Sequence, residues 1–196
     1  MTDFNQPLDK YAKAQRIVTD EQAIQAAKQV ADFALIKRDE RDQQRQLPFA
    51  VMDLFSQTGL GGIRIPKQYG GAEVSNRTLA DVFRILSKAD ANIGLIPQNQ
   101  ISLLNIINII GNDSQKRFIF GEILSGSRLA NGGPERDTKD SKTLATTLTI
   151  ANNGYYLNGE KFYSTGSSFA DYLAIKALHP EGHVVLTIID KATTGV

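Results

Sequence analysis

The sequence predicts an α+β protein, with an all-α helical domain over residues 1–126 and an antiparallel β-barrel or β-sandwich domain over 127–196. Two observations support this class, and a third, the chain length, bears on the number of domains. Up to residue 126 the apolar residues recur every three or four positions, as on one face of a helix. From residue 127 they alternate or form short runs, separated by Asn, Gly and Pro turn signals. The length of 196 residues suits one large or two small domains.

The first helix is predicted to begin after Thr19, because Gln22 three residues later completes a capping-box pattern. The helical pattern continues over 20–46. Pro48 is a favoured first residue for a second helix, which Gly59 is expected to end. The predicted buried face of the first helix consists of Ala23, Ala27, Val30, Ala34 and Leu35.

A Gly-rich stretch with one proline, over 60–76, predicts a long ordered loop between helices. Ser75, near its end, is expected to cap a helix over 78–90. A final helix is predicted after Asp113, with Gly126 closing it.

Residues 91–112 are mostly apolar, with polar residues three or four positions apart, which is typical of a buried helix with one narrow polar stripe. The stripe could face a ligand. The alternative, which we favour from the residues alone, is a core helix whose asparagines pair with neighbouring loops. The stripe consists of Asn99, Ser102, Asn105, Asn108 and Asn112.

The second domain is expected to contain short strands joined by turns. The Asn158-Gly159 pair is typical of a type I′ hairpin, so residues 155–157 are expected to pair with 161–163. A sheet this short with open edges would be a poor stand-alone domain, and we expect it to be incomplete. The predicted strand segments are 127–131, 143–151, 155–159, 161–165, 172–178 and 183–190.

The composition argues against several classes of function. Lys and Arg number 22 against 21 Asp and Glu, so the clustered positive charge that nucleic acid requires is not expected. The absence of cysteine excludes disulfides, thiolate nucleophiles and cysteine metal sites. His179 and His183 flank a turn and are expected to face solvent without forming a metal site. A signal pattern is absent, and the apolar run 101–110 is too short to span a bilayer. We therefore expect a cytoplasmic protein with neither nucleic-acid nor membrane partners.

Four stretches of the chain, in order, resemble the N-terminal domain and part of the middle domain of the acyl-CoA dehydrogenase superfamily of flavoproteins. Within it, IPQN at 96–99 and YSTG at 163–166 are most similar to the dibenzothiophene and sulfone monooxygenase branch. The resemblance implies a truncated middle domain at 127–196 and an absent C-terminal helical domain. The four stretches are GLGGIRIPKQYGGAE (59–73), LSKADANIGLIPQNQ (86–100), GNDSQKRFIFGEILSGSRLANGGPE (111–135) and YLNGEKFYSTGSSFADYLAI (156–175).

A flavin site needs an aromatic or apolar wall, hydrogen-bond donors and glycines for close approach. KFYSTG offers these at an expected strand end: Tyr163 as wall, Ser164 and Thr165 as hydroxyl donors, and Gly166 as space. Alternation along a strand would put Tyr163 and Thr165 on one face. The resemblance implies that Tyr163 lies against the ring of FAD or FMN, with Thr165 near its reactive edge. Taken alone, the stretch is more often a simple turn.

LANGGPE, the first segment of the β domain, is the second candidate for cofactor binding. Asn131 can donate and accept hydrogen bonds, and Gly132 and Gly133 expose backbone N–H groups. The resemblance implies that this strand end runs beside the pyrimidine side of the flavin. A bulge or plain turn is the alternative.

Asn99 and Gln100 are the predicted substrate-binding residues, at the start of the buried helix. The resemblance implies a histidine facing the active site at position 100 in the monooxygenase branch, where this chain has Gln100. Glutamine does not transfer protons near neutral pH. The catalytic residue is therefore unknown, and Gln100 is its candidate position.

Two activities follow from the resemblance. One is α,β-dehydrogenation of an acyl-CoA thioester, whose glutamate base comes from the C-terminal domain. The other is oxygenation of a small organosulfur compound by reduced flavin from a separate flavin reductase. An electron-transfer partner and a homotetramer of the full-length protein are also implied. The alternative is a catalytically incomplete fragment or truncated paralogue that serves packing or oligomerisation only.

Overall fold

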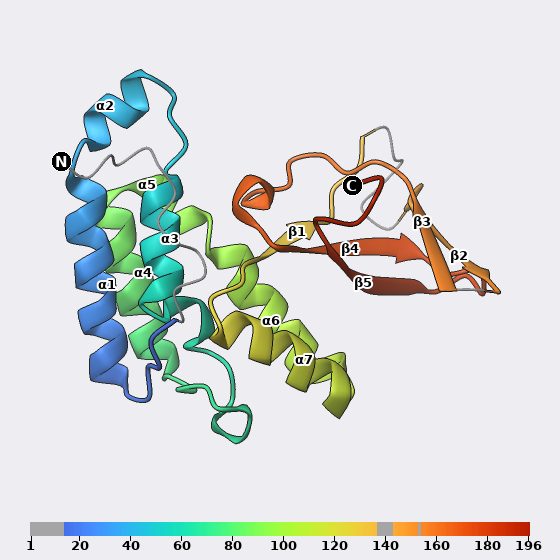
Figure 1. The fold of residues 1–196 in the computed structure, drawn as a ribbon, viewed down its shortest axis with the longest axis horizontal. Coiled ribbons are helices and arrows are strands. Elements are labelled where there is room, and N and C mark those ends of the chain that lie inside the picture. Colours follow the sequence, from blue (N-terminus) through green and yellow to red (C-terminus); the bar gives the residue numbers. More distant parts are fainter. Residues whose placement is uncertain (1–13, 137–142, 153) are drawn as a thin grey trace. The chain divides into compact units, whose positions relative to one another are not determined.

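The structure is a computed structural model that describes residues 14–136, 143–152 and 154–196. The chain forms two compact units, Met1–Arg128 and Leu129–Val196. The first is helical and the second contains the sheet, as the colours of Figure 1 show along the chain. The predicted α+β class is therefore confirmed. The helices are α1 Asp20–Leu35, α2 Arg38–Gln43, α3 Phe49–Gln57, η1 Leu60–Gly62, η2 Lys67–Tyr69, α4 Asn76–Ala89, α5 Ala91–Leu95, α6 Gln98–Ile110, α7 Asp113–Leu124 and η3 Ser167–Phe169.

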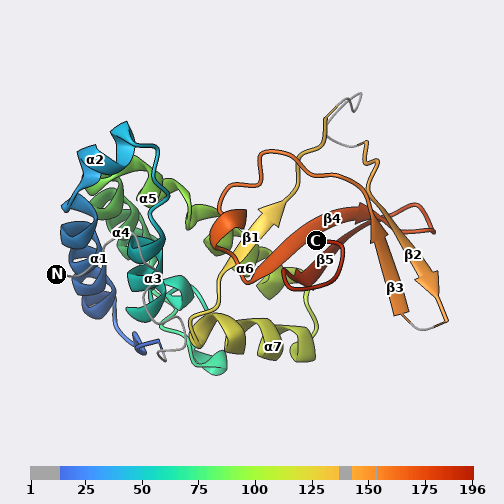
Figure 2. The same cartoon turned by 45° about the horizontal axis from the view of Figure 1, so that its top comes forward.

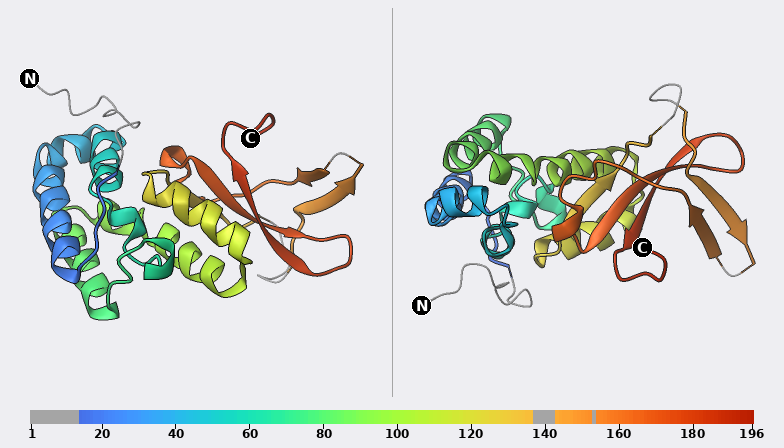
Figure 3. Two further views of the ribbon diagram at one scale, coloured as in Figure 1. Left: turned by 60° about the horizontal axis from the view of Figure 1, so that its bottom comes forward. Right: turned by 90° about the horizontal axis from the view of Figure 1, so that it is seen from above.

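The core of the helical unit forms where α1 packs on α4 and α3, a layering that the further views in Figure 3 also show. The Thr19–Gln22 capping box is present, and the predicted alanines and Val30 of α1 are buried. Leu35, which we expected on the same face, is exposed because it lies at the last turn of the helix. The largest fully buried side chains of this unit include Met52, Leu60, Ile63, Leu86, Leu104 and Phe120.

The single helix predicted over 20–46 is interrupted after Leu35. Lys37 adopts a left-handed conformation with φ +57°, and α2 begins at Arg38. The guanidinium of Arg41, from α2, donates to the carbonyl oxygens of Ala34 and Ile36. These carbonyls at the end of α1 thus find a donor outside their own helix, which removes the need for the helix to continue.

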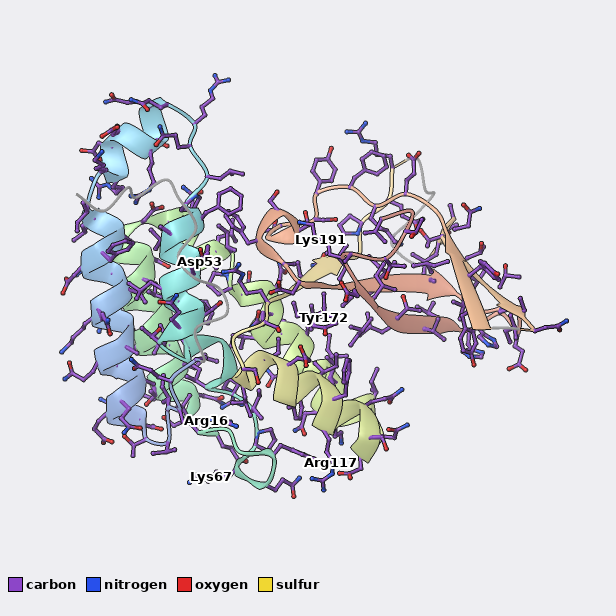
Figure 4. The ribbon with its side chains drawn as sticks, in the orientation of Figure 1. Arg16, Asp53, Lys67, Arg117, Tyr172 and Lys191 are labelled. Carbon is purple, nitrogen blue, oxygen red and sulfur yellow. The ribbon has the colours of Figure 1, made fainter. Side chains whose placement is uncertain are left out.

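The Gly-rich loop is ordered by tight packing, as predicted. Gly70 has φ +88°, and a Cβ atom on Gly71 would lie 2.0 Å from the carbonyl oxygen of Ile65. Arg16 donates to the carbonyl oxygen of Gly70 over 3.0 Å and lies beside this loop in Figure 4. Only glycine leaves enough space for these two approaches.

The apolar stretch 91–112 forms two helices, α5 and α6, with a turn at Ile96–Pro97 between them. Ser102, Asn105 and Asn108 face solvent, so the polar stripe does not point into the core. The helix is also less buried than predicted, because Ile109 and Ile110 are exposed as well. By length and hydropathy alone, Ala91–Ile110 could cross a membrane, yet 44% of its most apolar window is buried inside the protein, as in ordinary core helices.

The last helix of the unit begins one residue earlier than predicted. Asn112, rather than Asp113, is the N-cap of α7 and forms a capping box with Gln115. Asp113 instead pairs with Arg117 at 2.7 Å and accepts a hydrogen bond from the Tyr69 hydroxyl. Gly126, just beyond the helix, has the positive φ expected of a closing glycine.

The sheet is mixed, whereas the sequence predicted an antiparallel one. β4 pairs antiparallel with β5 along its full length, while β1 and β2 pair parallel with different parts of β4 (Figure 2). The long connections after β1 and after β3 allow parallel pairing, which a hairpin does not. The strands are β1 Leu129–Gly132, β2 Thr147–Ala151, β3 Gly154–Asn158, β4 Tyr172–Leu178 and β5 Val184–Asp190.

The predicted hairpin at Asn158-Gly159 is wrong. β3 pairs with the preceding strand β2, with Thr147 opposite Asn158, and residues 161–165 form no strand. A Cβ atom on Gly159 would lie 2.4 Å from Oγ1 of Thr146. This glycine therefore permits a close crossing of two chain segments and does not make a two-residue turn.

Candidate functional site

Two stretches that the sequence singled out lie side by side in the sheet unit. The backbone N–H of Phe162 donates to the carbonyl oxygen of Pro134 over 3.0 Å, which joins the chain after β1 to the chain after β3. The guanidinium carbon of Arg136 lies 4.1 Å from the centre of the Phe162 ring, within cation–π range. The end of LANGGPE and the start of KFYSTG thus form one continuous surface strip.

A buried ion pair fixes this strip. Nζ of Lys161 lies 2.5 Å from Oε1 of Glu135, and the two side chains are only 8% and 4% exposed. The Glu135 carboxylate also accepts hydrogen bonds from the N–H groups of Ala145 and Thr146 and from the Thr146 hydroxyl. Burial by itself raises the pKa of Glu135, but these donors outweigh it and lower the pKa to about 2. Glu135 is therefore ionised throughout the physiological range.

Sequence reasoning missed this pair as a site element. A single acid and a single lysine, 26 positions apart, carry no periodicity or motif that would link them. The only signal in the sequence is that each residue lies within a stretch that resembles the acyl-CoA dehydrogenase superfamily. Their contact depends on the tertiary crossing of the two segments.

The two glycines after Asn131 have different surroundings. A Cβ atom on Gly132 would lie 2.2 Å from Cδ1 of Ile175, so this glycine is required by packing against β4. A Cβ atom on Gly133 would meet only Oδ1 of Asn131, at 3.9 Å. Oδ1 of Asn131 accepts a hydrogen bond from the N–H of Gly133 over 3.2 Å. Gly133 therefore has open space beside it, whereas Gly132 has none.

The stretch from Tyr163 to Gly166 is a turn and not a strand end. Tyr163 has φ +56°, and the N–H of Thr165 donates to its carbonyl oxygen over 2.9 Å. Gly166, with φ +90°, then leads into η3. The expectation that strand alternation aligns Tyr163 with Thr165 is therefore wrong, because the polar run of small residues here folds into tight turns. Tyr163 is 77% exposed.

This turn offers hydrogen-bond donors that the described residues of the protein do not use. Among the described residues, the backbone N–H groups of Ser164 and Gly166 and the hydroxyl of Ser164 make no hydrogen bond. Each of these groups is thus available to an acceptor from outside the chain. Two N–H groups and a hydroxyl beside an exposed aromatic ring are suited to a flat ligand edged with acceptor atoms.

The end of the turn is held firmly. Nζ of Lys191 donates to the carbonyl oxygens of Ser167 and Ser168, at 2.9 and 3.2 Å. Figure 4 shows Lys191 near the start of β4. Phe169 is buried beneath them. The free donors of Ser164 and Gly166 are therefore attached to an anchored segment.

In the helical unit, Gln100 is buried and only 4% exposed. Its Nε2 donates to the carbonyl oxygen of Gly61 over 3.0 Å and so joins α6 to η1. A Cβ atom on Gly61 would lie 2.7 Å from the same nitrogen. This contact gives Gln100 a role in positioning the Gly-rich loop. The half-buried Asn99 lies next to it at the start of α6, and substrate contact by either residue stays a prediction.

Comparison with known proteins identifies relatives over almost the whole chain. The family model for the acyl-CoA dehydrogenase N-terminal domain matches residues 18–127. An acyl-CoA dehydrogenase of Bacillus subtilis is 29% identical over 91% of this chain and 50% of its own length. A dibenzothiophene monooxygenase of Rhodococcus erythropolis is 21% identical over 92% of this chain and 45% of its own.

Solved structures share the fold. The FMN-bound TdsC of Paenibacillus sp. A11-2 superimposes with a TM-score of 0.79 at 24% identity, covering 88% of this chain and 45% of that one. The chain spans between 38% and 50% of the length of the first curated relatives it matches.

Proposed function

From the premise that this chain belongs to the acyl-CoA dehydrogenase N-terminal domain family, we propose that it is part of a flavin-dependent oxidoreductase. The observation that carries the proposal is the set of unused donors at Ser164 and Gly166 beside the exposed Tyr163 ring. FAD or FMN offers the complementary features, a flat ring with acceptor atoms on its edge. The TdsC structure, which shares the fold, is FMN-bound, and this supports the same cofactor class.

The proposed contacts divide between two segments of the sheet unit. The turn from Tyr163 to Gly166 provides the ring wall and the donors, with Thr165 nearest the reactive edge. Asn131, Gly132 and Gly133 line the other side, where the open space at Gly133 permits close approach of the ligand. The buried Glu135–Lys161 pair holds the two segments in register and does not itself touch the cofactor.

Two reactions are proposed for the whole protein. A bound flavin supplies either acceptance of a hydride from an acyl-CoA thioester or, in the reduced form, activation of O₂ for oxygenation of a small organosulfur compound. The residues of this chain bind and orient the ring in both cases. Asn99 and Gln100 are proposed to shape the substrate side, Gln100 through its bond to Gly61. The second candidate function is packing or oligomerisation without catalysis.

Partners and location belong to the same proposal. The dehydrogenase reading requires an electron-transfer partner, and the monooxygenase reading requires a flavin reductase. A homotetramer and a cytoplasmic location are proposed for the full-length protein. Size-exclusion chromatography with light scattering would measure the oligomeric state.

The binding experiment titrates the untagged chain with FMN and with FAD and follows quenching of flavin fluorescence. We expect saturable binding of one flavin per chain. Ser164→Ala, which removes an unused hydroxyl, should weaken it by about three- to tenfold, the value of one hydrogen bond. Thr149→Val, on the exposed face of β2, is the matched control and should leave the affinity unchanged. Absence of saturable binding by both flavins contradicts the flavin proposal and favours the packing role.

The reaction experiment separates the two chemistries. The full-length protein is assayed with acyl-CoA and an artificial electron acceptor, and in parallel with reduced FMN, O₂ and dibenzothiophene. Reduction of the acceptor supports the dehydrogenase, and an oxygenated sulfur product supports the monooxygenase. If flavin binds but neither reaction proceeds, the substrate classes are wrong while the cofactor site stands.

A further inference from the structure

The turn between β4 and β5 brings together both histidines of the protein. The N–H of His179 donates to the carbonyl oxygen of His183 over 2.8 Å, and the N–H of Gly182 donates back to the carbonyl oxygen of His179. The two imidazole rings stack with their centres 4.4 Å apart and an angle of 23° between their planes. The backbone of the turn therefore holds the two rings as neighbours.

Glu181, at the tip of the same turn, aims its carboxylate at both rings. Its Oε2 lies 3.8 Å from Nδ1 of His179 and 3.9 Å from Nδ1 of His183. One potential ligand atom from each of the three residues lies within 4.8 Å of the other two. The sequence-based expectation that these histidines form no metal site stays a prediction, but the turn does fold residues 179, 181 and 183 onto one another.

We propose that this turn is a binding site for one divalent transition-metal ion of the Zn²⁺ class, with His179, Glu181 and His183 as ligands and water completing the shell. Zn²⁺ binds nitrogen and oxygen at about 2.0–2.2 Å, so ligand atoms around a tetrahedral ion lie roughly 3.3–3.6 Å apart. The observed separations from Oε2 exceed this range by a few tenths of an ångström. Rotation of the exposed Glu181 and His183 side chains would bring the three ligand atoms to this spacing.

The chemistry of the donors selects the ion. Two imidazole nitrogens and one carboxylate oxygen suit Zn²⁺, Ni²⁺ or Cu²⁺, whereas Mg²⁺ and Ca²⁺ prefer sites made only of oxygen. Nδ1 of His179 at present accepts a hydrogen bond of 3.2 Å from the N–H of Glu181. Its lone pair already points into the turn, and the ion would replace this long hydrogen bond.

The site differs from the proposed flavin strip in residues and in chemistry. It lies at the opposite end of β4 from Tyr172, the end that follows the Tyr163 turn. A bound ion would cross-link the two strands where they separate. By linkage, it should raise the stability of the β4–β5 hairpin in proportion to its occupancy.

The experiment uses the untagged 196-residue chain, because a histidine tag would compete for the ion. The sequence contains two histidines and no cysteine, so every imidazole in the protein belongs to this site. Isothermal titration calorimetry with Zn²⁺ should give one saturable site per chain, and Mg²⁺ should give none. Two-dimensional ¹⁵N NMR of the imidazoles should show both rings changing on addition of one equivalent of Zn²⁺.

Two ligand variants and one control complete the test. His183→Gln and Glu181→Gln should each weaken Zn²⁺ binding by at least about tenfold, with unchanged far-ultraviolet circular dichroism because both side chains are exposed. Glu160→Gln, an exposed acid of the same unit, should bind Zn²⁺ like the parent chain. The proposal is overturned if Zn²⁺ binding is absent, or if it persists unchanged in both ligand variants. Flavin binding is expected to be the same with and without Zn²⁺.

Discussion

At the scale of single residues, some glycines of the helical unit are required by close packing and others are not. Gly71 lies against the Ile65 carbonyl, while a Cβ atom on Gly121, on the exposed side of α7, would meet nothing within 4 Å. Gly71→Ala should therefore destabilise the protein by about 3 kcal/mol or more. Gly121→Ala should stabilise it by up to about 1 kcal/mol, because alanine loses less backbone entropy in a helix. Urea denaturation measures both, and equal effects would contradict the packing of the loop.

The Glu135–Lys161 pair predicts a dependence of stability on pH. The pKa of Glu135 is about 2 in the folded state, against an ordinary value of 4.5 for a glutamate side chain. Because folding lowers this pKa, the stabilisation is complete above pH 4.5 and is lost as the pH falls towards 2. The difference corresponds to about 3 kcal/mol. The free energy of unfolding, measured by urea titration from pH 7 to pH 3, should fall accordingly, and Glu135→Gln should flatten the fall.

The partner of the pair gives a second, independent prediction. Lys161→Met would leave the Glu135 carboxylate buried without its cation, at a cost of about 3–5 kcal/mol. The double variant Glu135→Gln with Lys161→Met should recover much of this loss, because no buried charge remains. A double variant no more stable than Lys161→Met alone would show that the two side chains do not interact. Chemical denaturation of the four proteins at pH 7 measures the coupling.

At the scale of elements, helix caps make the sharpest prediction. Asn112 accepts a hydrogen bond from the N–H of Gln115 over 2.9 Å, and the Gln115 side chain accepts one from the N–H of Asn112. Asn112→Ala should cost about 1 kcal/mol of stability. Asn108 lies at an exposed position within α6, away from the helix ends. Asn108→Ala should therefore not reduce the stability, because alanine is the better helix former there. Thermal denaturation followed by circular dichroism compares the two.

The elements also show which features the sequence could predict. The capping box at Thr19, the cap at Ser75 and the segments that became β1 to β5 depend on local spacing, and the structure contains all of them. The break after Leu35 depends on Arg41 reaching back to α1, and no local pattern reports such a contact. The Asn158-Gly159 hairpin failed for the same reason, since Thr146 determines what Gly159 does.

In the candidate site too, features that depend on local sequence could be predicted, and features that depend on tertiary contacts could not. Composition and motif could name the Tyr163 turn and LANGGPE as polar, Gly-containing segments. Sequence could not show that Phe162 bonds to Pro134, or that Glu135 and Lys161 are buried together, because these contacts form only when the sheet assembles. The sequence placed His179 and His183 at a turn, but it could not show that their rings stack or that Glu181 lies beside both of them.

At the scale of the whole molecule, the chain divides into two compact units. The flavin proposal therefore predicts that substitutions in the sheet unit can change flavin affinity without destabilising the helical unit. Gly133→Ala fills open space and should leave stability within about 0.5 kcal/mol of the parent. It should nevertheless weaken FMN or FAD binding in fluorescence titration, if the ring approaches this backbone. Unchanged affinity would remove Gly133 from the site.

The left-handed backbone at Tyr163 has a consequence for how the protein trades stability against activity. A side chain in that conformation costs roughly 1 kcal/mol or more that glycine would not. The ring also gains little from burial, since most of it faces solvent. Tyr163→Gly should therefore yield a more stable protein that holds flavin less well. Such a result would show that the tyrosine at position 163 lowers the stability of the protein and raises its affinity for flavin.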